Sequence, residues 1–162
     1  MNGSRNEHDQ EDPFDLARFV NAQEGVYGTA LSELRSGRKR SHWMWFIFPQ
    51  VAGLGYSLMA QRYAIWSLKE ARACLDHSVL GARLRECAEA VRAVEGRSAS
   101  EIMGNPDDLK LRSSMTLFAQ VDGPDSVFAG VLAKYFGGEQ DAETLRRLGL
   151  SAKEAPADGT AA

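Results

Sequence analysis

Three side chains in this sequence are suited to proton transfer or nucleophilic chemistry: His42, Lys110 and Ser114. Histidine is the side chain that most readily exchanges a proton near neutral pH. Lys110 and Ser114 lie about one turn apart on a helix predicted over 106–121, and a serine beside a neutral lysine can act as a nucleophile. No third group that would orient the pair is apparent. The alternatives are a hydrogen-bonded core histidine, a lysine that reaches solvent and a serine that permits close helix packing. We therefore treat the three as catalytic candidates and leave enzyme activity open.

Aromatic and basic side chains meet in the run 41–50, SHWMWFIFPQ, and in the residues just before it. Tryptophan buries a large area but its indole N–H needs a partner when buried, so the run predicts either the centre of the core or a pocket wall. Cations beside aromatic rings can hold phosphates or nucleotides. The same cations also fit the negative C-terminus of a helix that ends at Gly37. The ligand-binding candidates here are Arg38, Lys39, Trp43, Trp45 and Gln50.

Three further candidates complete the predicted site. Arg62 can bind an anion through two parallel hydrogen bonds, although an exposed salt bridge is an equal alternative. Tyr63 follows it directly, and Ser113 lies three residues after Lys110, on the edge of the same helix face. On the helical projection Lys110 and Ser114 are flanked by apolar residues, which predicts a polar notch in an apolar wall.

Two functions fit these residues. The first is a pocket for a small anionic or nucleotide-like molecule, with or without catalysis. The second is a non-catalytic interaction module, in which the aromatic segment is structural core and the basic segment docks a protein or nucleic acid. Three scattered histidines without HExxH spacing predict no metal site, and no GxxxxGK[ST] phosphate loop is present. No cofactor is expected.

Composition bounds the class of protein. The chain has 162 residues, of which 44% are hydrophobic, enough for one domain with its own core. A net charge of −3 argues against a dedicated nucleic-acid binder. No apolar run approaches the roughly 20 residues of a membrane helix, and 1–11 lacks the apolar segment of a signal peptide. We expect a cytoplasmic protein with free cysteines, and the sequence indicates no oligomeric state.

The elements that must position these residues are predicted to be helices, about seven or eight of them, in a single all-α domain over 12–149. Capping signals recur, including Asp12-Pro13, Asn105-Pro106 and the Ser98/Glu101 capping box. Polar, non-periodic segments predict disordered tails over 1–11 and 150–162. The run 41–50 reads either as a strand or as a short buried helix, and the helical neighbours favour the helix.

Several segments together resemble a known family. They are DPFD at 12–15, GRK at 37–39, SHWMWFIFPQ at 41–50, MAQRYAI at 59–65 and DLKLRSSMTLF at 108–118. On these motifs the chain resembles the bacterial domain of unknown function 1810 family, sometimes labelled calpastatin-like, over roughly 12–148. The resemblance implies a small multihelical bacterial protein without an assigned activity. The calpastatin label implies protease inhibition through disordered repeats, for which this repeat-free chain offers no basis.

Overall fold

The computed structural model describes residues 12–150, and the tails predicted for 1–11 and 151–162 lie outside this range. Within it the chain forms ten helices, which confirms the all-α class. The helices are α2 (Ala17–Gln23), α3 (Tyr27–Arg35), α4 (Met44–Ile47), α5 (Leu58–Arg62), α6 (Leu68–Asp76), α7 (Leu80–Ala93), α8 (Ala99–Met103), α9 (Asp107–Asp122), α10 (Val127–Phe136) and α11 (Ala142–Arg147). Several are one or two turns long, which is why the sequence pattern predicts fewer. No helix in the described range is long and apolar enough to cross a membrane.

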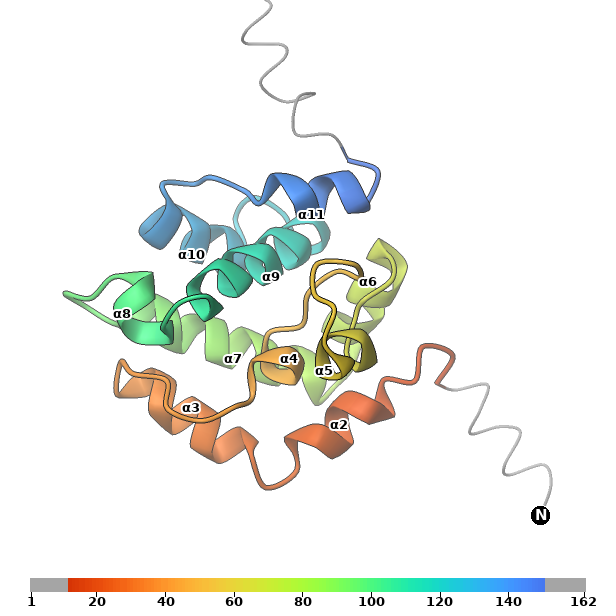
Figure 1. The fold of residues 1–162 in the computed structure, drawn as a ribbon, viewed down its shortest axis with the longest axis horizontal. Coiled ribbons are helices and arrows are strands. Elements are labelled where there is room, and N and C mark those ends of the chain that lie inside the picture. Colours follow the sequence, from red (N-terminus) through yellow and green to blue (C-terminus); the bar gives the residue numbers. More distant parts are fainter. Residues whose placement is uncertain (1–11, 151–162) are drawn as a thin grey trace, which may run out of the picture.

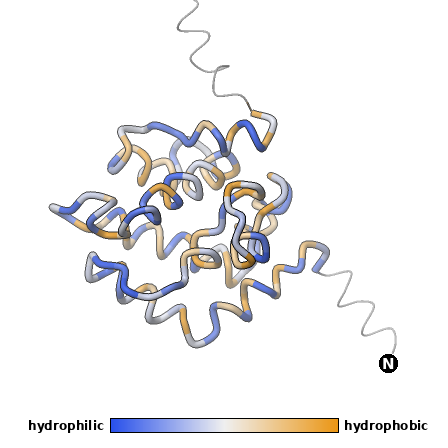
Figure 2. The backbone as a smooth tube through the Cα atoms, in the orientation of Figure 1, coloured by the Kyte–Doolittle hydropathy of each residue, from blue (hydrophilic) through white to orange (hydrophobic). Residues whose placement is uncertain are grey.

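The two longest helices, α7 and α9, organise the core. Helix α7 packs against α3, α6 and α10, while α9 packs against α6, α8, α10 and α11. The remaining helices lie around this pair in Figure 1. Hydrophobic and hydrophilic stretches alternate along the helices in Figure 2, as expected where each helix turns one face inward. Burying those faces supplies the main driving force for the fold.

One of the three predicted helix starts follows the predicted capping chemistry. Helix α2 begins at Ala17 and not after Asp12-Pro13, and Pro106 instead of Asn105 stands at the N-cap of α9, without a side-chain hydrogen bond. The Ser98 hydroxyl accepts a hydrogen bond from the Glu101 backbone while the Glu101 carboxylate accepts one from the Ser98 backbone, so this capping box is confirmed. Ser67 also caps α6, but the Glu70 carboxylate accepts from the backbone of Trp66 instead of completing the box. The helix predicted over 106–121 is α9, displaced by one residue at each end.

The aromatic run forms a single buried helical turn, α4, so the helical interpretation is confirmed. Trp43 before it and Phe48 after it are completely buried. The chain then makes an isolated parallel bridge between Val51 and Ile65. Its hydrogen bonds run from Ala52 N to the Ile65 carbonyl at 2.8 Å and from Ile65 N to the Gln50 carbonyl at 2.9 Å. The bridge closes a loop that contains α5 and brings the end of that loop back to α4.

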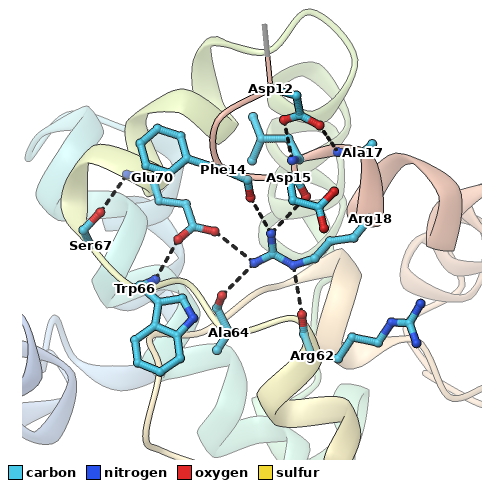
Figure 3. A network of polar contacts seen from close by, with 11 residues as sticks. Asp12, Phe14, Asp15, Ala17, Arg18, Arg62, Ala64, Trp66, Ser67 and Glu70 are labelled. Carbon is cyan, nitrogen blue, oxygen red and sulfur yellow. Dashed lines mark hydrogen bonds and ion pairs between the residues drawn. The ribbon is translucent and has the colours of Figure 1, made fainter. Parts of the chain in front are cut away.

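A partly buried arginine, Arg18, ties this loop to the N-terminal helix (Figure 3). Arg18 donates hydrogen bonds to the carbonyls of Phe14, Asp15, Arg62 and Ala64 and to the Glu70 carboxylate, at 2.6–2.9 Å. These five bonds use all five guanidinium N–H groups. Because two of the acceptors flank Tyr63, the arginine fixes the backbone on both sides of that residue.

Candidate functional site

A cleft of about 410 Å³ lies between α4, the loop 50–57, α5 and the N-terminal ends of α9 and α11. It brings together five of the residues that the sequence analysis selects, from four separate segments: Trp45, Gln50, Tyr63, Lys110 and Ser113. Its volume is in the range of small-molecule sites in proteins. The cleft is therefore the candidate site.

The ammonium group of Lys110 is only partly neutralised by its neighbours. Its Nζ lies 3.6 Å from Asp107 Oδ1 and 5.9 Å from the centre of the Trp45 ring, and the side chain is 35% exposed. The other oxygen of Asp107 lies 3.0 Å from Lys39 Nζ. One carboxylate thus serves two ammonium groups, so this corner of the cleft retains positive charge.

The acidic residues of the cleft, in contrast, are already compensated. Asp141 caps α11, where its Oδ2 accepts hydrogen bonds from the backbone and hydroxyl of Thr144, and its Oδ1 lies 3.9 Å from the Arg112 guanidinium. Glu143 forms ion pairs with Arg146 and Arg147. The hydrogen bond from Arg146 is the largest cause that lowers the pKa of Glu143. These carboxylates therefore do not cancel the charge on the opposite wall.

Three other cleft residues carry polar groups that make no hydrogen bond within the described residues: the Trp45 indole N–H, the Gln50 side-chain amide and the Tyr63 hydroxyl. All three belong to residues that line the cleft. Their donors and acceptors are available to a ligand. Together with Lys110 they form a mixed aromatic and polar lining, the usual composition of a ligand pocket.

Lys39 and Trp43 lie instead in the polar network under α4. Lys39 Nζ contacts the Ser41 carbonyl at 2.6 Å, the Asp107 carboxylate at 3.0 Å and the Trp43 ring at 4.8 Å, and its side chain is 7% exposed. Trp43 is buried and donates its indole N–H to Glu33. Both side chains are therefore engaged within the protein, and both hold α4 in place behind the cleft.

The structure places the remaining candidates outside the cleft lining. Arg38 and His42 are exposed on the segment before α4, and Arg62 is exposed with its guanidinium 5.7 Å from the centre of the Tyr63 ring. Ser114 is completely buried in α9, and its hydroxyl has no hydrogen-bond partner. The helix thus directs Lys110 to the cleft and Ser114 to the core, so they do not form a nucleophile pair in this structure. Their predicted catalytic roles stay predictions.

Glu33 positions the segment that carries the site, although no sequence pattern singles it out. Its carboxylate accepts hydrogen bonds from the backbone N–H groups of Arg40 and Ser41, from the Ser41 hydroxyl and from the Trp43 indole. Desolvation raises the pKa of Glu33, but these hydrogen bonds outweigh it and hold the pKa at about 2, against the usual 4.5. Hydrogen bonds to the charged form stabilise the carboxylate.

We expect Glu33→Gln to lower the free energy of unfolding by about 2 kcal/mol at pH 7, because it removes the charge from four hydrogen bonds. Since the folded-state pKa is depressed, this stabilisation is complete above the unfolded pKa and is lost as the pH falls from about 4.5 to about 2. Urea denaturation of both proteins at pH 7 and pH 3 measures it. Glu24→Gln, at an exposed glutamate, is the matched control. A wild-type advantage equal at both pH values would contradict the prediction.

The sequence analysis did not select Asp141, Glu143, Tyr56 or Leu109 as site residues, yet all four line the cleft. In the sequence, an aspartate at position 141 is fully explained as the N-cap of α11, so its type does not indicate a site residue. Its approach to Ser113 joins residues 28 apart in the chain, which local patterns do not report. For Tyr56 the sequence contains one weak signal of a site, because an aromatic residue follows the glycine-rich stretch Gly53-Leu54-Gly55.

The fold and the cleft define a small multihelical protein with an open polar and aromatic site. A family model described as "Protein of unknown function (DUF1810)" matches residues 13–148, and the chain belongs to this family. A solved structure, that of the conserved hypothetical protein Rv1873 from Mycobacterium tuberculosis, is 56% identical with a TM-score of 0.84. The match covers 86% of this chain and 100% of that one. No curated protein matches the chain.

Proposed function

We propose that this protein binds a small anionic ligand in the cleft beside α9. The observation that carries the proposal is the position of Lys110 on the cleft wall, where it shares the Asp107 carboxylate with the buried Lys39. A second cation near one carboxylate favours the approach of an anion. A ligand anion would complete the neutralisation of this corner.

Aromatic side chains extend the proposal to nucleotide-like ligands. Trp45 and Tyr63 line the cleft beside Lys110, and Tyr56 lies at its mouth with 84% of its surface exposed. Aromatic faces bind bases or sugar rings by stacking, and neighbouring cations bind the phosphates. The proposal concerns binding, and it requires no reaction at Lys110.

Replacing Lys110 with glutamine is expected to weaken binding of phosphate-bearing ligands at least about tenfold, because a hydrogen bond to a charged group contributes about 1.5–3 kcal/mol. The probes are inorganic phosphate, D-ribose 5-phosphate and AMP, and isothermal titration calorimetry gives the affinities. Lys69→Gln is the matched control, since Lys69 is an exposed lysine on α6 outside the cleft. Its affinities should equal those of the wild type.

Two results would oppose the proposal. One is that none of the three probes binds to the wild-type protein. The other is binding that survives Lys110→Gln unchanged, which would place the anion elsewhere, for example on the exposed arginines Arg38 and Arg40. Melting temperatures of both variants serve as the folding control.

A second candidate function is an interaction module. This hypothesis treats the aromatic run 41–50 as structural core, and Trp43, Phe46 and Phe48 in that run are buried. Four large apolar side chains also stand exposed within one segment: Tyr56, Leu58, Met59 and Trp66. Exposed aromatic and aliphatic clusters are typical of protein interfaces. Under this alternative Trp66→Ser would abolish binding of a partner protein, whereas Lys110→Gln would leave that binding unchanged.

A further inference from the structure

We infer that the ligand of the cleft is a phosphorylated sugar, bound through its phosphate by Lys110 and through a sugar hydroxyl by Asp141 Oδ1. The inference rests on the function proposed above and names the class of ligand. It assigns to Asp141 a role in specificity beyond that of a helix cap.

The two oxygens of Asp141 have different surroundings. Oδ2 lies 3.1 Å from the Ser113 hydroxyl and 3.1 Å from the Thr144 backbone nitrogen, and the Thr144 hydroxyl also donates to it. Oδ1 has only the Arg112 guanidinium, at 3.9 Å, which is beyond hydrogen-bond distance. The side chain is thus fixed through one oxygen, and the other oxygen of this cleft-lining residue makes no hydrogen bond within the described residues. An ionised carboxylate oxygen accepts hydrogen bonds only, so its partner must be a donor such as a hydroxyl.

Ser113 places Asp141 and Lys110 on neighbouring parts of the cleft wall. Ser113 follows Lys110 by three residues on α9, so their Cβ atoms are about 5–6 Å apart on the same helix face. Because Asp141 contacts Ser113 directly, its carboxylate lies about one helical turn along α9 from Lys110. A phosphorylated sugar carries both groups that these neighbouring residues would bind, a phosphate for Lys110 and a hydroxyl for Asp141.

An unpartnered tyrosine hydroxyl is independent support for a polar ligand. Tyr63 is only 7% exposed, and its hydroxyl makes no hydrogen bond within the described residues. In the same range Ser114 Oγ is the single side-chain polar atom that is sealed from solvent without a partner, so the Tyr63 hydroxyl keeps access to open space. The space that this side chain borders is the cleft. A ligand oxygen that displaces solvent from this position would take up the hydrogen bond of the hydroxyl.

The test compares D-ribose 5-phosphate with methyl phosphate, which carries the same phosphate monoester but no hydroxyl. We expect the wild-type protein to bind D-ribose 5-phosphate at least about tenfold more tightly, as a hydrogen bond to a charged acceptor implies. Asp141→Asn should remove this preference and leave methyl phosphate binding unchanged, because asparagine also caps helices well. Asp125→Asn, at an exposed aspartate outside the cleft, is the matched control and should keep the preference.

The outcomes separate the two proposals. Equal wild-type affinity for both compounds, still dependent on Lys110, would overturn the sugar inference and leave the proposed anion binding intact. A loss of both affinities in Asp141→Asn would also overturn it, since Asp141 would then act only through the fold. Absence of binding by either compound would overturn both proposals. The wild-type comparison decides the question even if Asp141→Asn fails to fold.

Discussion

Arg18→Ala is expected to lower the free energy of unfolding by about 3–5 kcal/mol, the range for removing one partner of a buried ion pair. The Arg18 and Glu70 side chains are 13% and 4% exposed, so the alanine variant leaves a buried carboxylate without its cation. It also removes a side-chain donor from four backbone carbonyls, among them those of Arg62 and Ala64. Urea denaturation at pH 7 measures the loss.

An exposed ion pair provides the control for this prediction. Arg35 and Glu86 are 62% and 46% exposed and lie 3.2 Å apart, so Arg35→Ala should cost less than about 1 kcal/mol. Similar losses for Arg18→Ala and Arg35→Ala would show that the Arg18 network does not hold the N-terminal helix to the loop. A loss above about 3 kcal/mol for Arg18 alone would support it.

Gly81→Ala is expected to destabilise the protein by about 3 kcal/mol, the upper part of the range for inserting a methyl group into a packed interior. A Cβ atom at Gly81 would lie 2.0 Å from the carbonyl oxygen of Leu75 and 2.8 Å from its carbonyl carbon. These are backbone atoms at the end of α6, so no side-chain rotation relieves the overlap. The two helices would have to separate where α6 packs on α7.

Gly28→Ala is the matched substitution and should have the opposite sign. Gly28 also lies in a helix, α3, but a Cβ atom there would meet nothing within 4 Å. Alanine at such a site stabilises by about 0.5–1 kcal/mol, mainly because it restricts the unfolded chain. Thermal unfolding of the two variants gives both signs. Destabilisation by Gly28→Ala, or tolerance of Gly81→Ala, would contradict the packing of these helices.

Local sequence signals account for most of the fold. The Ser98/Glu101 capping box predicts α8, because a cap depends on residues within one turn. Asn105-Pro106 correctly predicts that a helix follows, although Asn105 does not cap α9. The helical interpretation of the run 41–50 follows from its helical neighbours, although the helix covers only Met44–Ile47 and has no side-chain cap. The parallel bridge between Val51 and Ile65 was not predicted, since it joins segments that only the tertiary fold brings together.

In the candidate site, too, the sequence predicts some residues from their type, whereas the roles of others depend on contacts between distant segments. The residue types of Trp45, Tyr63 and Lys110 mark them as site candidates, and the cleft contains all three. The roles of Lys39 and Asp141 depend on long-range partners, Asp107 for the first and Ser113 for the second. Helical projection also grouped Ser114 with Lys110, whereas the packing of α9 buries the serine completely. Projection gives the face of a residue but not which neighbour covers that face.

The most direct test of the account is an NMR titration of the lysine side chains with inorganic phosphate. Isotope-labelled methyl groups on the lysine amines give one signal for each lysine, and the spectrum of Lys110→Gln assigns the signal of Lys110. The account predicts a saturable shift of the Lys110 signal, with the signal of exposed Lys69 unchanged. Equal, non-saturating shifts of both signals would show that phosphate only screens surface charge, and this would contradict an anion site in the cleft.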